Sequence, residues 1–290
     1  MKSSLWPWVM RALWLSVPFT SGAVFADALD STSRPVEPTA LIGLWTAWGA
    51  GMAMTLIPHT LTLTAFRIIA PAALAGTIWA VIDAGASSLG VAGLSVTAAA
   101  AVISLSPQMG TWFVNGTSYG DERRFLLRPP GPLLLGPIPL FWLVIVAGTV
   151  AGPLLLAAKR WAVGGIVLAV GIPAAVVAIR SMHALSLRWL VFVPAGVVVH
   201  DHLSVTDPVL FKRGGIRSLG PALAETTAHD LSQGALGLAL ELRARKPVEL
   251  AYFESPAANP RTEELDAIVI SVSRPGEVLA EARSRGIAVG

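Results

Sequence analysis

The cluster His200-Asp201-His202 is the place in this sequence where side chains could do chemistry. On a β-strand, residues two apart share a face, so the two histidines could bind one metal ion, with Asp207 or His229 as a third ligand. The cluster also stands at the end of an expected hairpin, where polar residues are ordinary, and spacing alone does not show a complete ligand set. The sequence therefore predicts a turn without a metal.

Ser204, beside these histidines, raises the alternative of a hydrolase. No G-x-S-x-G turn supports Ser204 as a nucleophile, and no glycine-rich phosphate loop or Walker-type lysine supports nucleotide hydrolysis. The chain has no cysteine, which excludes a thiol nucleophile, disulfides and Cys-ligated metal sites. We therefore expect no enzymatic activity and no cofactor. A hydrolase that uses His200, His202 and Asp207 is the weakest alternative.

Two short groups of basic residues are candidates for an interaction surface. They are Lys212, Arg213 and Arg217, and then Arg243, Arg245 and Lys246 at an expected turn. Ordinary solvated charge is the simpler interpretation. Alternatively, these residues contact anionic lipid headgroups, at about 1 kcal/mol for each charge near the membrane surface.

A third candidate is the charge cluster in the long loop from Ser106 to Gly131. Its members are Asp121, Glu122, Arg123 and Arg124. Such a cluster is usually a solvated face. The alternative is that Asp121 and Glu122 pair with the soluble part of the chain and fix its angle to the membrane.

The elements that must position these residues belong to a membrane protein. The 290 residues are 54% hydrophobic and 13% charged, with a mean hydropathy of +0.65, whereas soluble domains have about 25% charged residues. Charge is concentrated after Ser181, which predicts a membrane domain over residues 1–180 and a soluble domain over 181–290. The net charge of +3 comes mostly from helix ends and is no argument for nucleic acid.

Apolar runs long enough to cross a bilayer, which takes about 20 residues, set the number of spans. We expect six, near residues 5–25, 40–57, 61–82, 89–105, 132–157 and 162–179. The first is ambiguous, because Lys2, Arg11 and the A-x-A-like run Val24-Phe25-Ala26 also fit a cleaved signal peptide. We favour a retained helix.

The distribution of basic residues predicts orientation, since cytoplasmic loops are rich in Lys and Arg. Lys2, Arg67, Arg123, Arg124, Arg128, Arg180 and Arg188 fall on one side if the N-terminus is inside. Arg34 and the pair Lys159-Arg160 fall on the other side, and this pair breaks the rule. The expected location is the inner (plasma) membrane with a cytoplasmic C-terminal domain.

The tail reads as short strands followed by one helix. Trp189–Val193 and Val197–Val199 flank the turn Pro194-Ala195-Gly196 and predict a hairpin. Further strands are expected at 209–213, 216–219, 235–242, 248–253 and 267–272. The strands 235–242 and 248–253 should pair across a turn at 243–247, with Leu236, Leu238, Leu240 and Leu242 on one face. Pro275 should open a helix capped by Ser273, with Val278, Leu279 and Ala282 on its apolar face.

This tail resembles the bacterial pleckstrin-homology-like (bPH) domain membrane proteins. The likeness rests on Trp189–Val193, on Gly196-Val197-Val198-Val199, and on Ser271–Pro275 leading into the helix. It implies a partly open β-barrel or sandwich closed by the helix and used for binding, with no catalytic residues. The composition also resembles multi-pass membrane proteins of high-GC actinobacteria.

Taken together, these patterns predict a non-enzymatic membrane scaffold or accessory protein. Its cytoplasmic domain would bind a protein partner or the membrane surface, and a homo-oligomer is an alternative partner. A transporter or lipid-handling protein, with a path between the Pro- and Gly-rich spans, is the second hypothesis. Against it, no ionisable residue except Arg11 lies deep within a span, whereas ion-coupled transport usually needs one.

Overall fold

The computed structural model describes residues 5–30, 32–33, 35–254 and 259–290, which form two compact units. The helical unit comprises Met1–Gly116 and Pro139–His183, and the β unit comprises Thr117–Ile138 and Ala184–Gly290. The β unit therefore includes a segment that precedes the last two long helices, as well as the tail expected from the sequence. Lys2 and Arg34 lie outside the described residues.

Six helices in the described part of the chain are long and apolar enough to cross a membrane. They are α1 (Trp6–Asp30), α2 (Val36–Leu56), α3 (Thr60–Ala84), α4 (Ser88–Leu105), the span Gly131–Ala157 and α8 (Trp161–Leu185). The fifth span consists of α6 (Gly131–Leu135) and α7 (Pro137–Ala157), which are separated at Gly136. Large apolar side chains such as Ile82 and Val102 are exposed, which is unfavourable in water and ordinary in lipid. The expected six apolar helices are confirmed, and they indicate a membrane-embedded protein.

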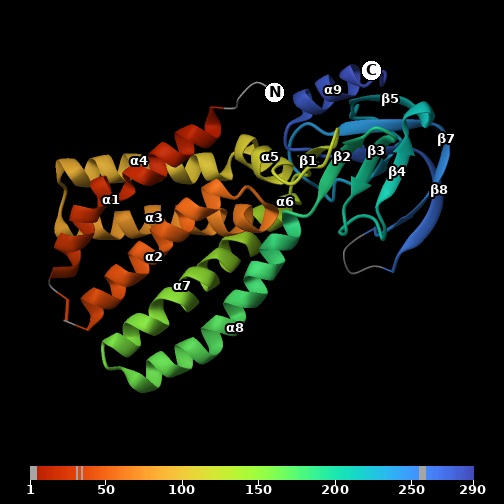
Figure 1. Ribbon diagram of the computed structural model, residues 1–290. Helices are drawn as coiled ribbons and strands as arrows, with labels where there is room; N and C mark the ends of the chain where they lie inside the picture. The colour runs from red at the N-terminus through yellow and green to blue at the C-terminus, as the bar shows by residue number, and fades with distance from the viewer. Residues whose placement is uncertain (1–4, 31, 34, 255–258) are drawn as a thin grey trace. The chain divides into compact units, whose positions relative to one another are not determined.

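The helices α1 to α4 form a bundle in which α1 packs against the other three (Figure 1). The Trp14 indole N–H donates to the Trp48 carbonyl at 2.8 Å, and the Trp48 indole returns a bond to the Trp14 carbonyl at 2.9 Å. A Cβ atom at Gly51 would overlap the Trp14 ring. Small residues thus permit the close approach of α1 and α2, as they commonly do between membrane helices.

The helices α7 and α8 form a hairpin whose crossing point also depends on glycine. A Cβ at Gly148 would lie 2.6 Å from the Gly171 carbonyl oxygen, so the two backbones touch there. The Trp142 indole N–H donates to the Ile68 carbonyl of α3 at 3.0 Å, next to a small apolar cluster shared by these helices. Glycine therefore permits the close packing of α7 and α8 at this crossing.

Polar side chains gather at one end of the helical unit. Arg11 Nε and Nη2 donate to the Thr55 carbonyl at 3.2 and 3.0 Å, Arg67 Nε donates to the Ser104 carbonyl at 3.3 Å, and Thr64 Oγ1 lies 3.1 Å from His183 Nδ1. These contacts join the starts of α1 and α3 to the ends of α2, α4 and α8. The opposite helix ends carry Asp27, Asp30, Glu37 and Asp83, together with Lys159 and Arg160.

The first sheet of the β unit is antiparallel, with the order β1-β2-β3-β4. Its strands are β1 (Arg123–Leu126), β2 (Trp189–Val193), β3 (Gly196–His200) and β4 (Val209–Lys212). The β2–β3 hairpin is confirmed, and a Cβ at Gly196, whose φ is +155°, would overlap the Phe211 carbonyl of β4. The segment expected to be a loop from Ser106 to Gly131 instead contains β1 and the helix α5 (Pro107–Asn115).

The second sheet has the order β5-β7-β8-β6, with β6 parallel to β8. Its strands are β5 (Ile216–Pro221), β6 (His229–Asp230), β7 (Leu240–Tyr252) and β8 (Arg261–Ile270), and the 3-10 turn η1 (Arg213–Gly215) precedes β5. The expected turn at 243–247 is wrong: β7 continues through it as one strand of 13 residues. Pro247 lies where the β7–β8 register shifts between Arg243 and Val248, and such a bulge tolerates proline.

Two further expectations for the tail are wrong. Leu236 and Leu238 precede β7 and are exposed, so they do not share a buried strand face with Leu240 and Leu242. Ser273 does not cap the terminal helix α9 (Pro275–Ser284), whose N-cap residue is Arg274 and which has no side-chain cap.

The two sheets and α9 enclose one apolar core, which holds Phe192, Leu219, Tyr252 and Val278. The sheets meet at the bridges Leu127–Val272 and Val205–Tyr252. Within α9, Val278 and Ala282 are buried and Leu279 is partly buried, as expected from their spacing. A sheet-rich unit with a C-terminal helix is therefore confirmed.

Candidate functional site

Strand pairing brings the two basic groups of the sequence together. Ile216 of β5 lies opposite Ala244 of β7, so the residues after β4 lie beside the bulge of β7. Five of the six cations are exposed here: Lys212, Arg213, Arg217, Arg245 and Lys246, which we call the basic rim. None of the five side chains forms an ion pair or hydrogen bond with another described residue. The exposed carboxylate nearest in the strand register is Asp266 of β8, opposite the bulge, and it is not paired with any of them.

Arg243 is not part of the basic rim. Its Nε is paired with Oε1 of Glu241, a carboxylate that is largely buried and also accepts a hydrogen bond from the Thr226 hydroxyl. These three residues line a cleft of about 340 Å³ beside β5, which is within the usual range for small-molecule sites. Glu241 already has two partners and is therefore not a free acid or base, although a second carboxylate, that of Glu225, also lines the cleft.

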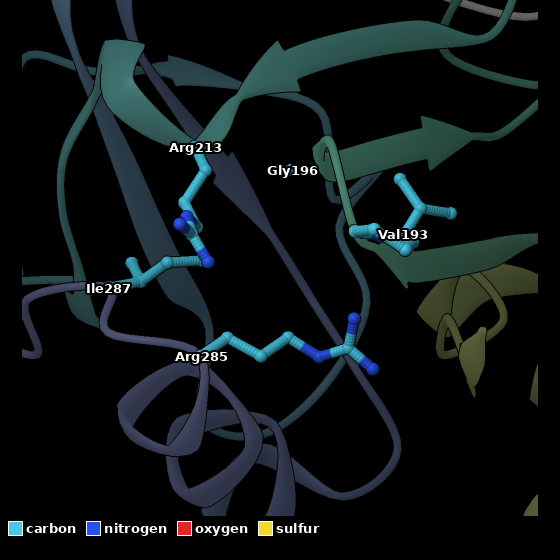
Figure 2. Close-up of a pocket in the computed structure, with 6 residues that line it drawn as sticks. Val193, Gly196, Arg213, Arg285 and Ile287 are labelled. Atoms are coloured by element: carbon cyan, nitrogen blue, oxygen red, sulfur yellow. The ribbon is translucent and has the colours of Figure 1, made fainter. Parts of the chain in front are cut away.

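A smaller cavity lies beside the basic rim (Figure 2). We call it the arginine notch; it measures about 40 Å³ and is lined by Val193, Pro194, Gly196, Arg213, Arg285 and Ile287. Figure 2 shows the Arg213 side chain extending toward Ile287 and the Arg285 side chain extending toward Val193. Sequence reasoning missed Arg285, because its place depends on how α9 packs against the strands.

Arg285 is held in place by several contacts. Its Nε donates to Glu281 Oε1 at 2.7 Å, its Nη2 donates to the Asp121 carbonyl oxygen, and its guanidinium carbon lies 5.7 Å from the centre of the Phe192 ring. Asp121 therefore contributes its backbone carbonyl, and not its carboxylate, to this contact, which joins it to Arg285 at the end of α9.

The other members of the Asp121–Arg124 cluster are built into the first sheet. Arg124 Nε and Nη2 donate to Glu122 Oε1 and Oε2 at 2.8 and 3.2 Å, and this guanidinium holds the pKa of Glu122 below its ordinary value. Arg124 also lies over the Trp189 ring at 4.9 Å, and Arg123 lies 5.8 Å from the Phe125 ring. Of these contacts, the one between Arg124 and Trp189 joins β1 to β2.

The His200-Asp201-His202 cluster serves the fold of the β unit. His200 ends β3, stacks on Trp189 at 5.3 Å and has its Nδ1 2.9 Å from the Leu187 carbonyl, whereas His202 lies in the following turn. The two histidines therefore do not share a strand face. His229 lies instead against the Tyr252 ring at 4.0 Å. Over the ranges that the structure describes, no three His, Cys, Asp or Glu side chains form a group that could hold a metal.

Asp201 belongs to a buried ion pair that sequence reasoning missed. Its Oδ1 and Oδ2 accept bonds from Arg188 Nε and Nη2 at 2.6 and 2.8 Å, and both side chains are 1% exposed. Ser204 Oγ donates to Asp201 Oδ2 at 2.9 Å and also lies 2.9 Å from the Leu231 carbonyl, while Arg188 Nη1 donates to the Arg128 carbonyl at 3.0 Å. Ser204 is thus a fixed structural side chain next to a carboxylate and not next to a histidine base.

One run, Gly116-Thr117-Ser118-Tyr119-Gly120, matches the G-x-S-x-G pattern. It follows the helix α5 and precedes the strand β1. A nucleophilic elbow has the reverse order, with a strand before the serine and a helix after it. Ser118 is therefore not placed as a nucleophile.

Comparison with known proteins gives no relative: no protein-family model, no curated protein and no solved structure matches this chain. The geometry of the basic rim, the arginine notch and the large cleft is therefore the basis for inferring function.

Proposed function

We propose that this protein is a non-enzymatic membrane scaffold whose β unit docks an acidic segment of a partner protein on the basic rim. The observation that carries the proposal is the β5–β7 pairing, which gathers five exposed cations from two separate stretches of sequence. Cations without partners among the described residues attract an acidic ligand over a distance and raise its association rate.

The neighbouring strand favours a polypeptide over a lipid surface. Among the described strands, only β3 pairs with β4, so β4 is an edge of the first sheet. Leu210 of β4 is 40% exposed, and Lys212 ends the strand. An open strand edge can accept an extended peptide through backbone hydrogen bonds, and the adjacent cations would select an acidic one.

The β unit further supports the resemblance to pleckstrin-homology-like domains. A meander of four antiparallel strands, a second sheet and a terminal helix against the core fit a partly open barrel closed at one end. In this interpretation the hairpin α7–α8 is inserted between the first two strands of the domain. The function of such a domain is binding, in agreement with the basic rim.

We further propose that the β unit is cytoplasmic and that the membrane is the inner (plasma) membrane. The polar end of the helical unit holds Arg11 and Arg67 as well as His183, and α8 leads from there into the β unit. Acidic residues dominate the opposite helix ends. This asymmetry supports a cytoplasmic β unit, because basic residues mark the cytoplasmic side.

The docking proposal is tested by cross-linking the full-length protein in native membranes and identifying the cross-linked proteins by mass spectrometry. The variant K212Q/R217Q/R245Q/K246Q removes four rim charges and leaves Arg213 in place. The control R261Q/R283Q removes two exposed charges elsewhere on the β unit. We expect an acidic protein that the parent and the control capture, that the rim variant loses, and whose capture weakens as salt rises.

Equal capture by the parent and the rim variant would contradict the proposal. The alternative of the membrane surface predicts a different result. In that case the rim variant would lose binding to vesicles that contain anionic phospholipid, while its set of cross-linked proteins would stay unchanged.

A further inference from the structure

Two guanidinium groups face the same small cavity in the β unit. The arginine notch lies where the β2–β3 turn, η1 and the chain after α9 meet, and both Arg213 and Arg285 line it (Figure 2). No carboxylate is among the six residues that line the notch in the described structure. Two like charges at one cavity repel each other, and a bound anion would remove this repulsion.

The two arginines differ in how many of their side-chain N–H donors are already used. Arg285 is fixed by Glu281, by the Asp121 carbonyl and by the Phe192 ring, which leaves its Nη1 group as a donor. Arg213 uses its backbone N–H to bind the Ala195 carbonyl at 2.8 Å, while its side chain has no partner among the described residues. The notch thus combines one preorganised guanidinium with one that is free to close on a ligand.

The size of the notch limits what it can hold. A cavity of about 40 Å³ has room for roughly three water-sized groups, at about 10–15 Å³ for each. A phosphate group presents three terminal oxygens, so one face of it fits while the rest of the ligand stays outside. A larger anionic head would not enter.

We propose that the arginine notch binds a phosphate monoester, carried either by a small molecule or by a phospholipid headgroup. Arginine forks bind phosphate oxygens through charge-assisted, often bidentate hydrogen bonds. A phosphate monoester carries about −1.5 to −2 charges at pH 7, which matches two guanidinium groups better than the single charge of a carboxylate does. This inference goes beyond the docking of a partner protein, since the notch can take a small anion whether or not a protein docks beside it.

The test uses the full chain in nanodiscs of a zwitterionic lipid, with inorganic phosphate as the probe in isothermal titration calorimetry. We expect R213Q to weaken phosphate binding at least tenfold, because it removes one charged donor set. The matched control R217Q removes an equal charge from the basic rim outside the notch and should change the affinity less than twofold. The affinity for a phosphate monoester such as glycerol 3-phosphate should also fall between pH 7.5 and pH 5.5, because a monoester loses its second charge at about pH 6.

The source of the phosphate is distinguished by two further titrations. Glycerol 3-phosphate in solution represents a small phosphomonoester, and nanodiscs that contain phosphatidic acid represent a headgroup with the same phosphate chemistry. If the headgroup is the ligand, phosphatidic acid in the nanodisc occupies the notch of the parent protein and abolishes its binding of inorganic phosphate. The weak residual binding by R213Q should then stay unchanged, because this variant does not hold the headgroup. If a soluble ester is the ligand, glycerol 3-phosphate binds more tightly than inorganic phosphate, and lipid composition has no effect.

Absence of phosphate binding at millimolar concentration would overturn the proposal, and so would equal weakening by R213Q and R217Q, which would show a diffuse basic surface. R285Q is not used as the deciding variant, because Arg285 also holds Glu281 and the Asp121 carbonyl. The rim variant of the docking test keeps Arg213, so the failure of one proposal leaves the other standing.

Discussion

At the scale of single residues, the buried Arg188–Asp201 pair is a contact that we expect to stabilise the β unit. Both side chains are 1% exposed, and the pair joins the start of β2 to the turn after β3. Removing one partner of a buried pair leaves an uncompensated charge, at a cost of about 3–5 kcal/mol. We therefore expect Asp201→Asn to lower the melting temperature of the full chain in detergent by several degrees and to make the β unit sensitive to protease.

The control for this prediction lies six residues away. Asp207 is exposed in the same loop, and Asp207→Asn should change stability by no more than about 0.5 kcal/mol. If the two variants melted and were digested alike, the Arg188–Asp201 pair would not stabilise the protein.

This pair could have been found from the sequence, whereas the arginine notch could not. A two-residue turn between Val193 and Gly196 sets the hairpin register, which pairs Trp189 with His200 and leaves Arg188 facing Asp201 one step further out. Local turn chemistry thus predicts the contact. Arg213 and Arg285 are 72 positions apart in the chain, and only the packing of α9 against the strands brings them together.

At the scale of elements, the sequence predicts the helices better than the strands. An apolar run of about 20 residues is a strong signal for a span, because a bilayer leaves the backbone no other partner. The strand β7 is different, because Arg243-Ala244-Arg245-Lys246-Pro247 has the composition of a turn. The pairing of Ala244 with β5, and of Arg243 and Val248 with β8, keeps this segment within one strand. Tertiary pairing outweighs local preference here, as is common for strands.

The contact of α1 with α2 gives a prediction at this scale. Gly51→Val should strain the bundle, because its side chain would overlap the Trp14 ring, and overpacking typically costs about 1–3 kcal/mol. Gly49→Val is the matched control, since a Cβ at Gly49 meets nothing within 4 Å. The measurement is the melting temperature of the two variants in the same detergent.

The comparison also tests whether the first segment is retained. If α1 were removed as a signal peptide, Trp14 would be absent and both valine variants would melt alike. A lower melting temperature for Gly51→Val alone would therefore support a retained helix, in agreement with the burial of Trp14, Val24 and Ala28 in the bundle.

At the scale of the whole molecule, the proposed orientation is open to a direct test, because the chain has no cysteine. Single cysteines can be introduced at exposed sites without removing a native thiol. Lys246→Cys reports on the β unit, and Lys159→Cys reports on the turn between α7 and α8. The reagent is a maleimide that does not cross membranes, applied to intact cells and to permeabilised cells.

The expected labelling result follows from the unequal distribution of basic residues between the two ends of the helical unit. Arg11 and Arg67 are at the end where α8 leads into the β unit, and the positive-inside rule places such an end in the cytoplasm. Lys246→Cys should react only after permeabilisation, and Lys159→Cys should react in intact cells. The reverse pattern would mean that Lys159 and Arg160, the pair that opposes the majority, determine the orientation, and that the basic rim meets its ligand outside the cytoplasm.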